Sequence, residues 1–256
     1  MIKNYKCLKT KFKSEIKTGN KNIDEVKLIY KPVIDSKFVM IVLHGLTTRK
    51  EDFLPYGDYL NSLGVSSFHI DLPYHGERSF NDNNHSDFDI NPERIKLFMN
   101  HILIDIKKSV SLLEKIGYKN IGILGYSLGG ISALLAMGKD NRLNKCISIC
   151  SGGDIADLVL NSPMVQDISE ELIIKGYDYQ DLKKLLADVE PCNYARNINP
   201  NNILMINGIF DNIVPIRNVR SFLSNLNGHP HIIWQPYDHF SIEPIKPIKE
   251  YLGGLN

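Results

Sequence analysis

Surplus charge, long apolar runs and cysteine are all scarce in this sequence of 256 residues. Thirty Lys and Arg side chains stand against 29 Asp and Glu, so the formal net charge is only +1. That balance offers no basic footprint for a nucleic acid or for an anionic membrane surface. The longest apolar run, Phe38–Leu43, is far shorter than the ~18 residues that a spanning helix needs. The sequence therefore predicts neither a nucleic-acid partner nor a membrane span.

The four cysteines form no C-x-x-C pair; they are Cys7, Cys146, Cys150 and Cys192. Cys146 and Cys150 fall four residues apart in one predicted buried strand, which is too far for a disulfide bond. Scattered cysteines of this kind are typical of reducing compartments. The lysine-rich N-terminal stretch also lacks the apolar segment of a secretory signal. We therefore expect free thiols and a cytoplasmic protein.

From residue 37 onward, short apolar runs alternate with helical patterns, which is typical of βαβ units and a mainly parallel sheet. The predicted core strands are residues 37–43, 65–72, 120–126, 145–151, 202–208 and 231–237. An earlier run, residues 24–33, is predicted to be an antiparallel strand at the edge of this sheet. The sequence thus predicts an α/β fold.

The longest predicted helix covers residues 92–116, with Asn91 as its N-cap and Pro92 at its first position. Apolar side chains recur along it at steps of three and four and should form one buried face: Ile95, Phe98, Ile102, Ile106, Val110 and Leu113. His101 falls within this helix and is expected in solvent. Residues 154–199 interrupt the alternation with short helical patterns, so we predict one domain with a small helical cap inserted there.

The strongest chemical signal is Gly125-Tyr126-Ser127-Leu128-Gly129, which follows a predicted strand and precedes a predicted helix. A strand-to-helix turn this sharp leaves no room for side chains beside its central residue, so the turn requires small residues there. Ser127 would then be exposed at the carboxyl end of the strand. A loop serine without catalytic function is the alternative, but the flanking strand and helix favour a nucleophile.

A serine hydroxyl needs a general base to accept its proton. Of the eight histidines, His239 lies on the loop after the last predicted strand, where the base belongs in the chain order serine, acid, histidine. The acid that orients the imidazole is predicted to be Asp211, which follows strand 202–208. Asp154, after the preceding strand, is the alternative. Asp238 adjoins the histidine in sequence, which makes the required geometry awkward.

The negative charge that develops on a substrate carbonyl needs preorganised hydrogen-bond donors. The first predicted donor is the backbone N–H of Leu128. The second should come from the loop HGLTT after residue 43, and Leu46 is the choice because Gly45 lets the backbone turn sharply. We expect His44 to support this loop by hydrogen bonding, and His75 to be structural, in a polar network with Asp71 and Arg78.

Five segments, HGLT, DLPYHGER, GYSLGG, GIFDNIVP and DHF, together resemble the α/β-hydrolase superfamily over residues 25 to 250. Within it, the spacing is similar to small bacterial and archaeal carboxylesterases of the dienelactone-hydrolase and prolyl-oligopeptidase-like branch. The resemblance implies a mostly parallel sheet of about eight strands with helices on both faces. It also implies hydrolysis of acyl esters through Ser127, Asp211 and His239, with Leu46 and Leu128 as oxyanion donors.

Two departures limit this transfer. Dienelactone hydrolases carry a cysteine nucleophile where this sequence has serine, and 36 residues before the first core strand cannot build the propeller of a prolyl-oligopeptidase-type peptidase. We predict a serine carboxylesterase acting on small-molecule esters with short to medium acyl chains. A thioesterase or acyltransferase, and a small serine peptidase, would use the same residues and stay open as alternatives. A non-catalytic binding module would not need all of these features.

The apolar side chains of the predicted cap either line an acyl pocket or pack the cap onto the sheet: Met164, Val165, Leu172, Ile173 and Ile174. Side chains between residues 82 and 93 match the oxygen-ligand spacing of a calcium loop, but Asp87 stands where the turn requires glycine. His229 and His231 lack a third ligand nearby. We therefore predict no metal and no cofactor.

Overall fold

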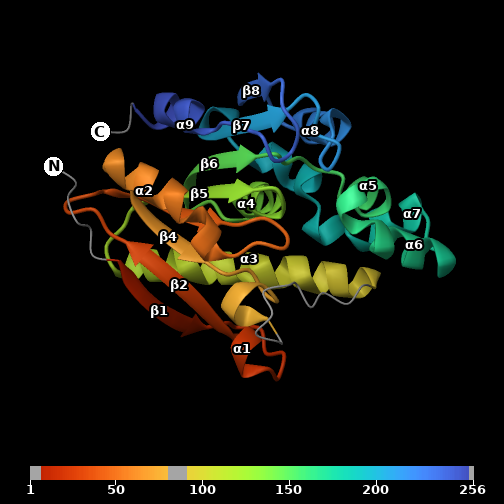
Figure 1. The fold of residues 1–256 in the computed structure, drawn as a ribbon, viewed down its shortest axis with the longest axis horizontal. Coiled ribbons are helices and arrows are strands. Elements are labelled where there is room, and N and C mark those ends of the chain that lie inside the picture. The colour runs from red at the N-terminus through yellow and green to blue at the C-terminus, as the bar shows by residue number, and fades with distance from the viewer. Residues whose placement is uncertain (1–6, 80–90, 254–256) are drawn as a thin grey trace.

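The computed structural model describes residues 7–79 and 91–253 and arranges them around one eight-stranded sheet (Figure 1). The strand order is β1-β2-β4-β3-β5-β6-β7-β8. β2 pairs with β1 and β4 in antiparallel fashion, and the other neighbours are parallel. The predicted α/β fold with a mostly parallel sheet is therefore confirmed. Asp87 and the other residues of the calcium-like spacing up to position 90 lie outside the described residues.

The strands are β1 (Leu8–Lys13), β2 (Glu25–Lys31), β3 (Phe38–Leu43), β4 (Ser66–Ile70), β5 (Asn120–Tyr126), β6 (Leu143–Ile149), β7 (Ile203–Gly208) and β8 (His231–Gln235). The helices are α1 (Lys21–Asp24), α2 (Leu54–Ser62), α3 (Pro92–Lys115), α4 (Leu128–Lys139), α5 (Ile155–Asn161), α6 (Gln166–Ile174), α7 (Tyr179–Leu185), α8 (Ile216–Leu223) and α9 (Ile245–Leu252). Short 3-10 turns join several of them.

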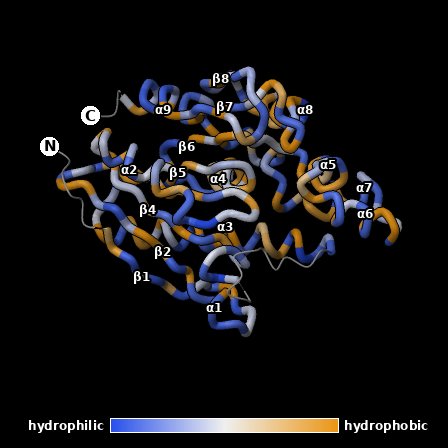
Figure 2. Tube along the Cα trace, viewed as in Figure 1, coloured by the Kyte–Doolittle hydropathy of each residue, from blue (hydrophilic) through white to orange (hydrophobic). Residues whose placement is uncertain are grey.

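The edge of the sheet differs from the prediction. β2 was expected at the edge, but β1 pairs with its outer side, in a register that sets Leu8 opposite Tyr30 and Phe12 opposite Val26. β1 is largely exposed and alternates lysine with other residues, so its tube mixes blue with orange in Figure 2. Lysine side chains on an edge strand discourage pairing with other molecules.

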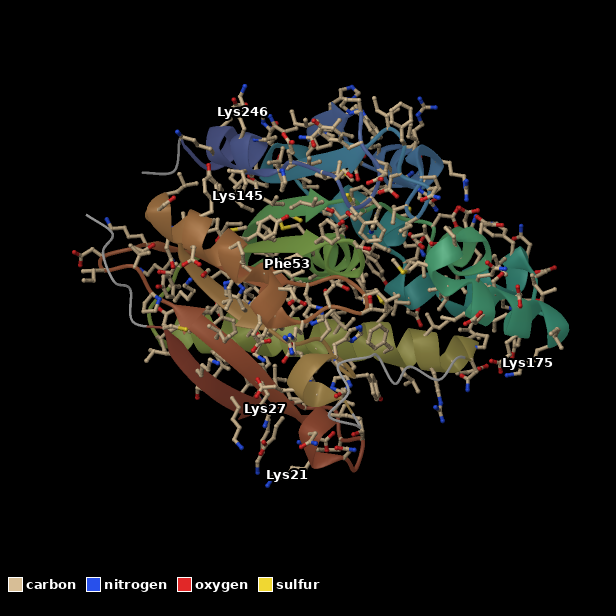
Figure 3. All side chains as sticks on the ribbon, in the orientation of Figure 1. Lys21, Lys27, Phe53, Lys145, Lys175 and Lys246 are labelled. Atoms are coloured by element: carbon tan, nitrogen blue, oxygen red, sulfur yellow. The ribbon has the colours of Figure 1, made fainter. Side chains whose placement is uncertain are left out.

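Apolar side chains cover both faces of the sheet. One cluster joins it to α3, α4 and α8, and a smaller one joins it to α2 and α9. The predicted apolar face of α3 is buried, and the Asn91 side chain caps the helix by accepting from Arg94 N at 2.8 Å. In Figure 3, Lys21, Lys175 and Lys246 lie on the periphery, whereas Phe53 lies within. Each buried Leu, Ile or Phe contributes about 1.5–3 kcal/mol to stability.

His101 is not in solvent as expected, because it is only 2% exposed. Its ring lies 3.0 Å from the hydroxyl of Ser14, which follows β1. Arg78, itself fully buried, forms an ion pair with Asp105 at 2.8 Å and donates to the carbonyl oxygens of Ile23 and Asp71. Ser14 and Arg78, which are distant from His101 in sequence, supply much of this polar environment, and the helical pattern of α3 could not reveal them.

The loop after β4 is tied to the loop after β3 by buried charge. Lys50 is 2% exposed, and its ammonium lies 2.6 Å from Asp71 and also contacts Glu77. Asp71 further accepts from the Lys50 backbone N–H at 2.9 Å. His75 is buried and structural as expected, but it bonds to Pro73 O at 2.8 Å rather than to the Asp71 or Arg78 side chains.

The segment between β6 and β7 holds α5, α6 and α7 within residues 154–199. Figure 1 shows these helices gathered beyond the arrowheads of β6 and β7, at the carboxyl end of the sheet. We call this segment the β6–β7 insertion. Among the described residues, no helix has the length and apolar character needed to cross a membrane.

Three histidines in the interior stay neutral at pH 7. Burial lowers the pKa of His69 to about 3, and the nearby positive charge of Lys31 adds to this effect. Burial also lowers the pKa of His75 to about 4 and that of His101 to about 4. Each of the three residues is at most 2% exposed.

The free energy of unfolding should therefore decrease as the pH falls from ~6.5, the reference pKa of histidine, toward 4. Within that window the unfolded chain binds protons at these sites and the folded chain does not, at a cost of about 2 kcal/mol per histidine at pH 5. Urea unfolding at pH 7 and pH 5 measures the loss. His69→Gln should lose less than the wild type or the exposed control His229→Gln, and equal losses would contradict the assignment.

Candidate functional site

The junction between β5 and α4 holds Ser127 in a strained conformation. Its φ is 53° and its ψ is −117°, in a region that non-glycine residues rarely adopt at a cost of about 1–3 kcal/mol. The Ser127 backbone N–H donates to Ile149 O on β6 at 2.8 Å, and its carbonyl accepts from Ile131 N on α4 at 2.9 Å. The strained turn is thus fixed from both neighbouring elements.

Two glycines allow this turn to pack against its surroundings. A Cβ on Gly125 would overlap the carbonyl of Gly129. A Cβ on Gly129 would lie 2.6 Å from Leu43 O, at the end of β3, and about as close to His44 O. Since these obstacles are backbone atoms, they cannot rotate away as side chains do. Glycine at these two positions is therefore a steric requirement.

Ser127, His239 and Asp211 come together at the carboxyl ends of the strands. His239 Nε2 lies 2.9 Å from Ser127 Oγ, and His239 Nδ1 lies 2.7 Å from Asp211 Oδ2. The second oxygen of Asp211 accepts from the backbone N–H groups of Ile213 and Val214 at 2.9 and 2.8 Å. Because this carboxylate accepts throughout, Nδ1 carries the imidazole proton and Nε2 presents a lone pair to the serine. All three side chains are buried.

The other two candidate acids, Asp154 and Asp238, form hydrogen bonds with groups other than the His239 imidazole. Asp154 caps α5 by accepting from Asp157 N, and it accepts the Tyr179 hydroxyl at 3.0 Å. Asp238 accepts from the backbone N–H groups of the two residues beyond His239. The structure therefore brings Asp211 to the imidazole and leaves Asp154 on the β6–β7 insertion.

The backbone of His239 is held by two side chains that the sequence did not single out. The Tyr126 hydroxyl and the Cys150 thiol, the latter at 3.4 Å, both donate to the His239 carbonyl. Burial raises the pKa of both groups, so each keeps its proton as a donor. The sequence places Tyr126 next to Ser127 and so near the site. Nothing in the sequence, however, shows that the ends of β5 and β6 contact the loop that carries His239.

Among the described residues, one group of side chains has ligand atoms close enough together to hold a metal ion, all within 4.8 Å of one another: Cys150, Asp211 and His239. Metals bind the thiolate rather than the thiol, and burial together with the Asp211 charge raises the pKa of Cys150. The carboxylate and imidazole are already hydrogen-bonded to each other. The donor set therefore suits a proton relay better than a metal site.

His44 supports the loop after β3, as expected. Its Nδ1 donates to Gly45 O at 2.7 Å, and its Nε2 accepts from Leu72 N at 2.9 Å. Burial lowers the pKa of His44 well below its usual value, which keeps the imidazole neutral for both bonds. The strained turn lies at Thr47, with φ 62°, and not at Gly45 as the sequence suggested.

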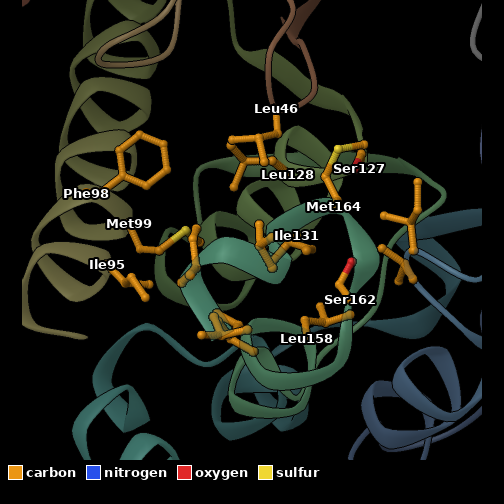
Figure 4. A pocket seen from close by; sticks show the side chains of 16 residues that line it. Leu46, Ile95, Phe98, Met99, Ser127, Leu128, Ile131, Leu158, Ser162 and Met164 are labelled. Carbon is orange, nitrogen blue, oxygen red and sulfur yellow. The ribbon is translucent and has the colours of Figure 1, made fainter. Parts of the chain in front are cut away.

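An apolar cavity of about 130 Å³ opens beside the serine hydroxyl (Figure 4). Leu46 and Leu128, the predicted oxyanion donors, both line it, and its far walls come from α3 and the β6–β7 insertion. Of the 16 lining residues within the described chain, only Ser127 and Ser162 have polar side chains. Of the apolar residues that the insertion offered, Met164 and Val165 line the cavity, Leu172 is buried in the core, and Ile173 and Ile174 are exposed.

The packing of the turn predicts unequal effects of alanine at two glycines. Gly129→Ala should lower the free energy of unfolding by about 2–3 kcal/mol, because overpacking against backbone outweighs the gain in helix propensity. Gly45→Ala is the matched control. Its Cβ would lie 3.2 Å from Tyr126 Cδ1, a side-chain atom that can yield, so its loss should be under ~1 kcal/mol. Urea unfolding distinguishes the two, and similar losses would refute the steric requirement.

Comparisons with known proteins identify the fold and the family of the chain. No curated protein matches the sequence. Several solved structures share the fold. A cold-adapted esterase from an Arctic intertidal metagenomic library has 17% identity and a TM-score of 0.67, and the match covers 96% of this chain and 92% of that one. Acetyl xylan esterase 1 from a Thermoanaerobacterium species has 17% identity and a TM-score of 0.71 (96% of this chain, 86% of that one), and the Pyrococcus horikoshii acylaminoacyl peptidase has 20% identity and a TM-score of 0.70 (97% of this chain, 40% of that one). Residues 40–221 match the model described as "Alpha/beta hydrolase family". The chain belongs to the alpha/beta hydrolase family.

Proposed function

We propose that this protein is a serine carboxylesterase that hydrolyses esters with short to medium acyl chains through an acyl-enzyme intermediate on Ser127. One observation carries the proposal. A serine hydroxyl, hydrogen-bonded to a histidine that a carboxylate orients, opens into an apolar cavity. Esterases among the structures that share the fold support the same activity.

In the first step, Ser127 Oγ attacks the ester carbonyl and His239 Nε2 accepts its proton. Asp211 stabilises the imidazolium by its bond to Nδ1. The tetrahedral intermediate then collapses, the bond to the alcohol oxygen breaks, and the imidazolium gives the proton to that oxygen. The acyl group is left esterified to Ser127.

In the second step, water attacks the acyl carbon while the same imidazole accepts a proton from the water. The bond from the acyl carbon to Ser127 Oγ then breaks, the carboxylic acid leaves, and the imidazolium returns the proton to Ser127 Oγ. The backbone N–H groups of Leu46 and Leu128 are proposed to bind the carbonyl oxygen in both steps. Both residues line the cavity beside the serine. Such donors each contribute roughly 10²–10³ in rate.

The cavity supports a limit on the acyl chain. Its volume is about 130 Å³, and an apolar cavity of about 150 Å³ in another protein holds one benzene ring. The space therefore suits about six carbon atoms. Because the lining described above contains no charged side chain, a neutral aliphatic chain fits it better than a charged one.

Ser127→Ala should reduce the hydrolysis of p-nitrophenyl acetate, butyrate, octanoate and laurate by ~10³-fold or more. For the wild type, kcat/KM should rise about fourfold per added methylene while the chain still enters the cavity, from the ~0.8 kcal/mol gained by each buried CH₂. The exposed Ser224→Ala is the control and should keep wild-type rates. Turnover unaffected by Ser127→Ala would move the nucleophile elsewhere, and a maximum at C12 or longer would contradict the chain-length limit.

The choice of acid and base is tested by pH and by two asparagine variants. Asp211→Asn should lower kcat by roughly 10³–10⁴, because it permits the wrong imidazole tautomer, whereas Asp154→Asn should stay close to the wild type. Wild-type activity should fall toward acidic pH, since only a neutral His239 can accept the serine proton. A flat profile of kcat/KM from pH 5 to 8, or a greater loss in Asp154→Asn, would overturn these assignments.

A further inference from the structure

Ser162 is the second polar side chain on the otherwise apolar wall of the cavity. We propose that its hydroxyl binds an oxygen-bearing substituent on the acyl chain, so that the preferred substrates are hydroxyacyl esters rather than plain alkanoyl esters. This inference rests on the proposed esterase function and specifies its substrate class.

The Ser162 hydroxyl opens into the cavity instead of being packed against the protein. The residue is only 7% exposed, and no side chain or backbone group of the described chain forms a hydrogen bond with its Oγ. Figure 4 shows this oxygen directed from the end of α5 into the space enclosed by the lining side chains. Because this oxygen is not among the enclosed unpartnered side-chain atoms of the described residues, it is available to a molecule that enters the cavity.

The Ser162 side chain does not form the capping hydrogen bond that a serine usually makes at the end of a helix or the start of a turn. Ser162 follows α5 and precedes the 3-10 turn Pro163–Val165, yet its side chain does not cap that turn. Only its backbone is engaged, with its N–H donating to Leu158 O at 3.0 Å and its carbonyl accepting from Val165 N at 3.1 Å. By contrast, Ser169 on α6 donates its hydroxyl to Leu160 O at 2.6 Å.

The surroundings of Ser162 give it discriminating power. The residues near Ser162 in sequence that line the same cavity are apolar, so their side chains offer no alternative hydrogen bond: Leu158, Val159, Met164 and Val165. A plain alkyl chain that displaced solvent from the cavity would leave the hydroxyl unsatisfied. A chain with its own hydroxyl would restore the bond, and the difference corresponds to roughly tenfold or more in kcat/KM.

The geometry also separates this contact from the reacting atoms. Ser127 and Ser162 occupy separate parts of the wall in Figure 4, one at the β5–α4 junction and the other at the end of α5. A substituent that reaches Ser162 therefore lies along the chain, away from the scissile carbonyl. The contact selects the substrate and takes no part in proton transfer.

The test compares ethyl hexanoate with its 3-, 5- and 6-hydroxy derivatives by titrating the released acid. The wild type should favour at least one hydroxy isomer over hexanoate by about tenfold in kcat/KM. Ser162→Ala should lose this preference and hydrolyse plain hexanoate at least as well as the wild type, because no hydroxyl is then left unsatisfied. Ser162→Thr, which keeps a hydroxyl, should retain the preference, and Ser169→Ala is the matched control.

Two outcomes would overturn the assignment of Ser162: a wild type that prefers plain hexanoate over every hydroxy isomer, or a preference unchanged in Ser162→Ala. Each of these requires ester turnover that Ser127→Ala abolishes, so the proposed esterase function would survive them. Failure of the wild type to hydrolyse any ester above the Ser127→Ala background would instead refute the esterase function and, with it, this inference.

Discussion

The close packing of the β5–α4 junction against β3 is the constraint on which the rest of the site depends. Gly129 sits where a side chain would strike the carbonyls of Leu43 and His44, so α4 can begin directly beside the end of β3. That contact sets the Leu128 backbone next to the loop that carries Leu46. It also holds Ser127 at positive φ, with its hydroxyl toward His239. The proposed nucleophile and the proposed oxyanion donors are thus placed by one steric fit.

A second set of interactions keeps the loop after β3 from relaxing. His44 can donate to Gly45 O and accept from Leu72 N together only while it is neutral, and burial enforces that state. Lys50 and Asp71 join the same two loops by a buried ion pair. Since breaking a buried pair by removing one partner costs about 3–5 kcal/mol, these contacts hold the loop firmly. The rigidity expected of an oxyanion loop therefore depends on groups that take no part in the chemistry.

The sequence predicted the parallel core, the strained turn and the three residues that meet there, because these depend on local patterns: apolar runs, glycine spacing and chain order. It misplaced the edge of the sheet, although the alternation of lysine in β1 was a signal for a half-exposed strand. It also placed His101 in solvent, since helical periodicity says nothing of Ser14 or Arg78, which are distant in sequence. The donors from Tyr126 and Cys150 to the His239 carbonyl likewise arise only when separate strands meet.

The relay and the cavity are built by different parts of the chain, and this division has a consequence. Ser127, Asp211 and His239 follow strands of the sheet, whose register fixes their distances. The cavity walls that contact a substrate chain come largely from α3 and the β6–β7 insertion, which pack on the sheet without carrying its register. Substitutions in the insertion can therefore change the size or polarity of the cavity while the relay stays intact. Ser162 lies in that segment, so the selectivity proposed for its hydroxyl does not depend on the distances within the relay.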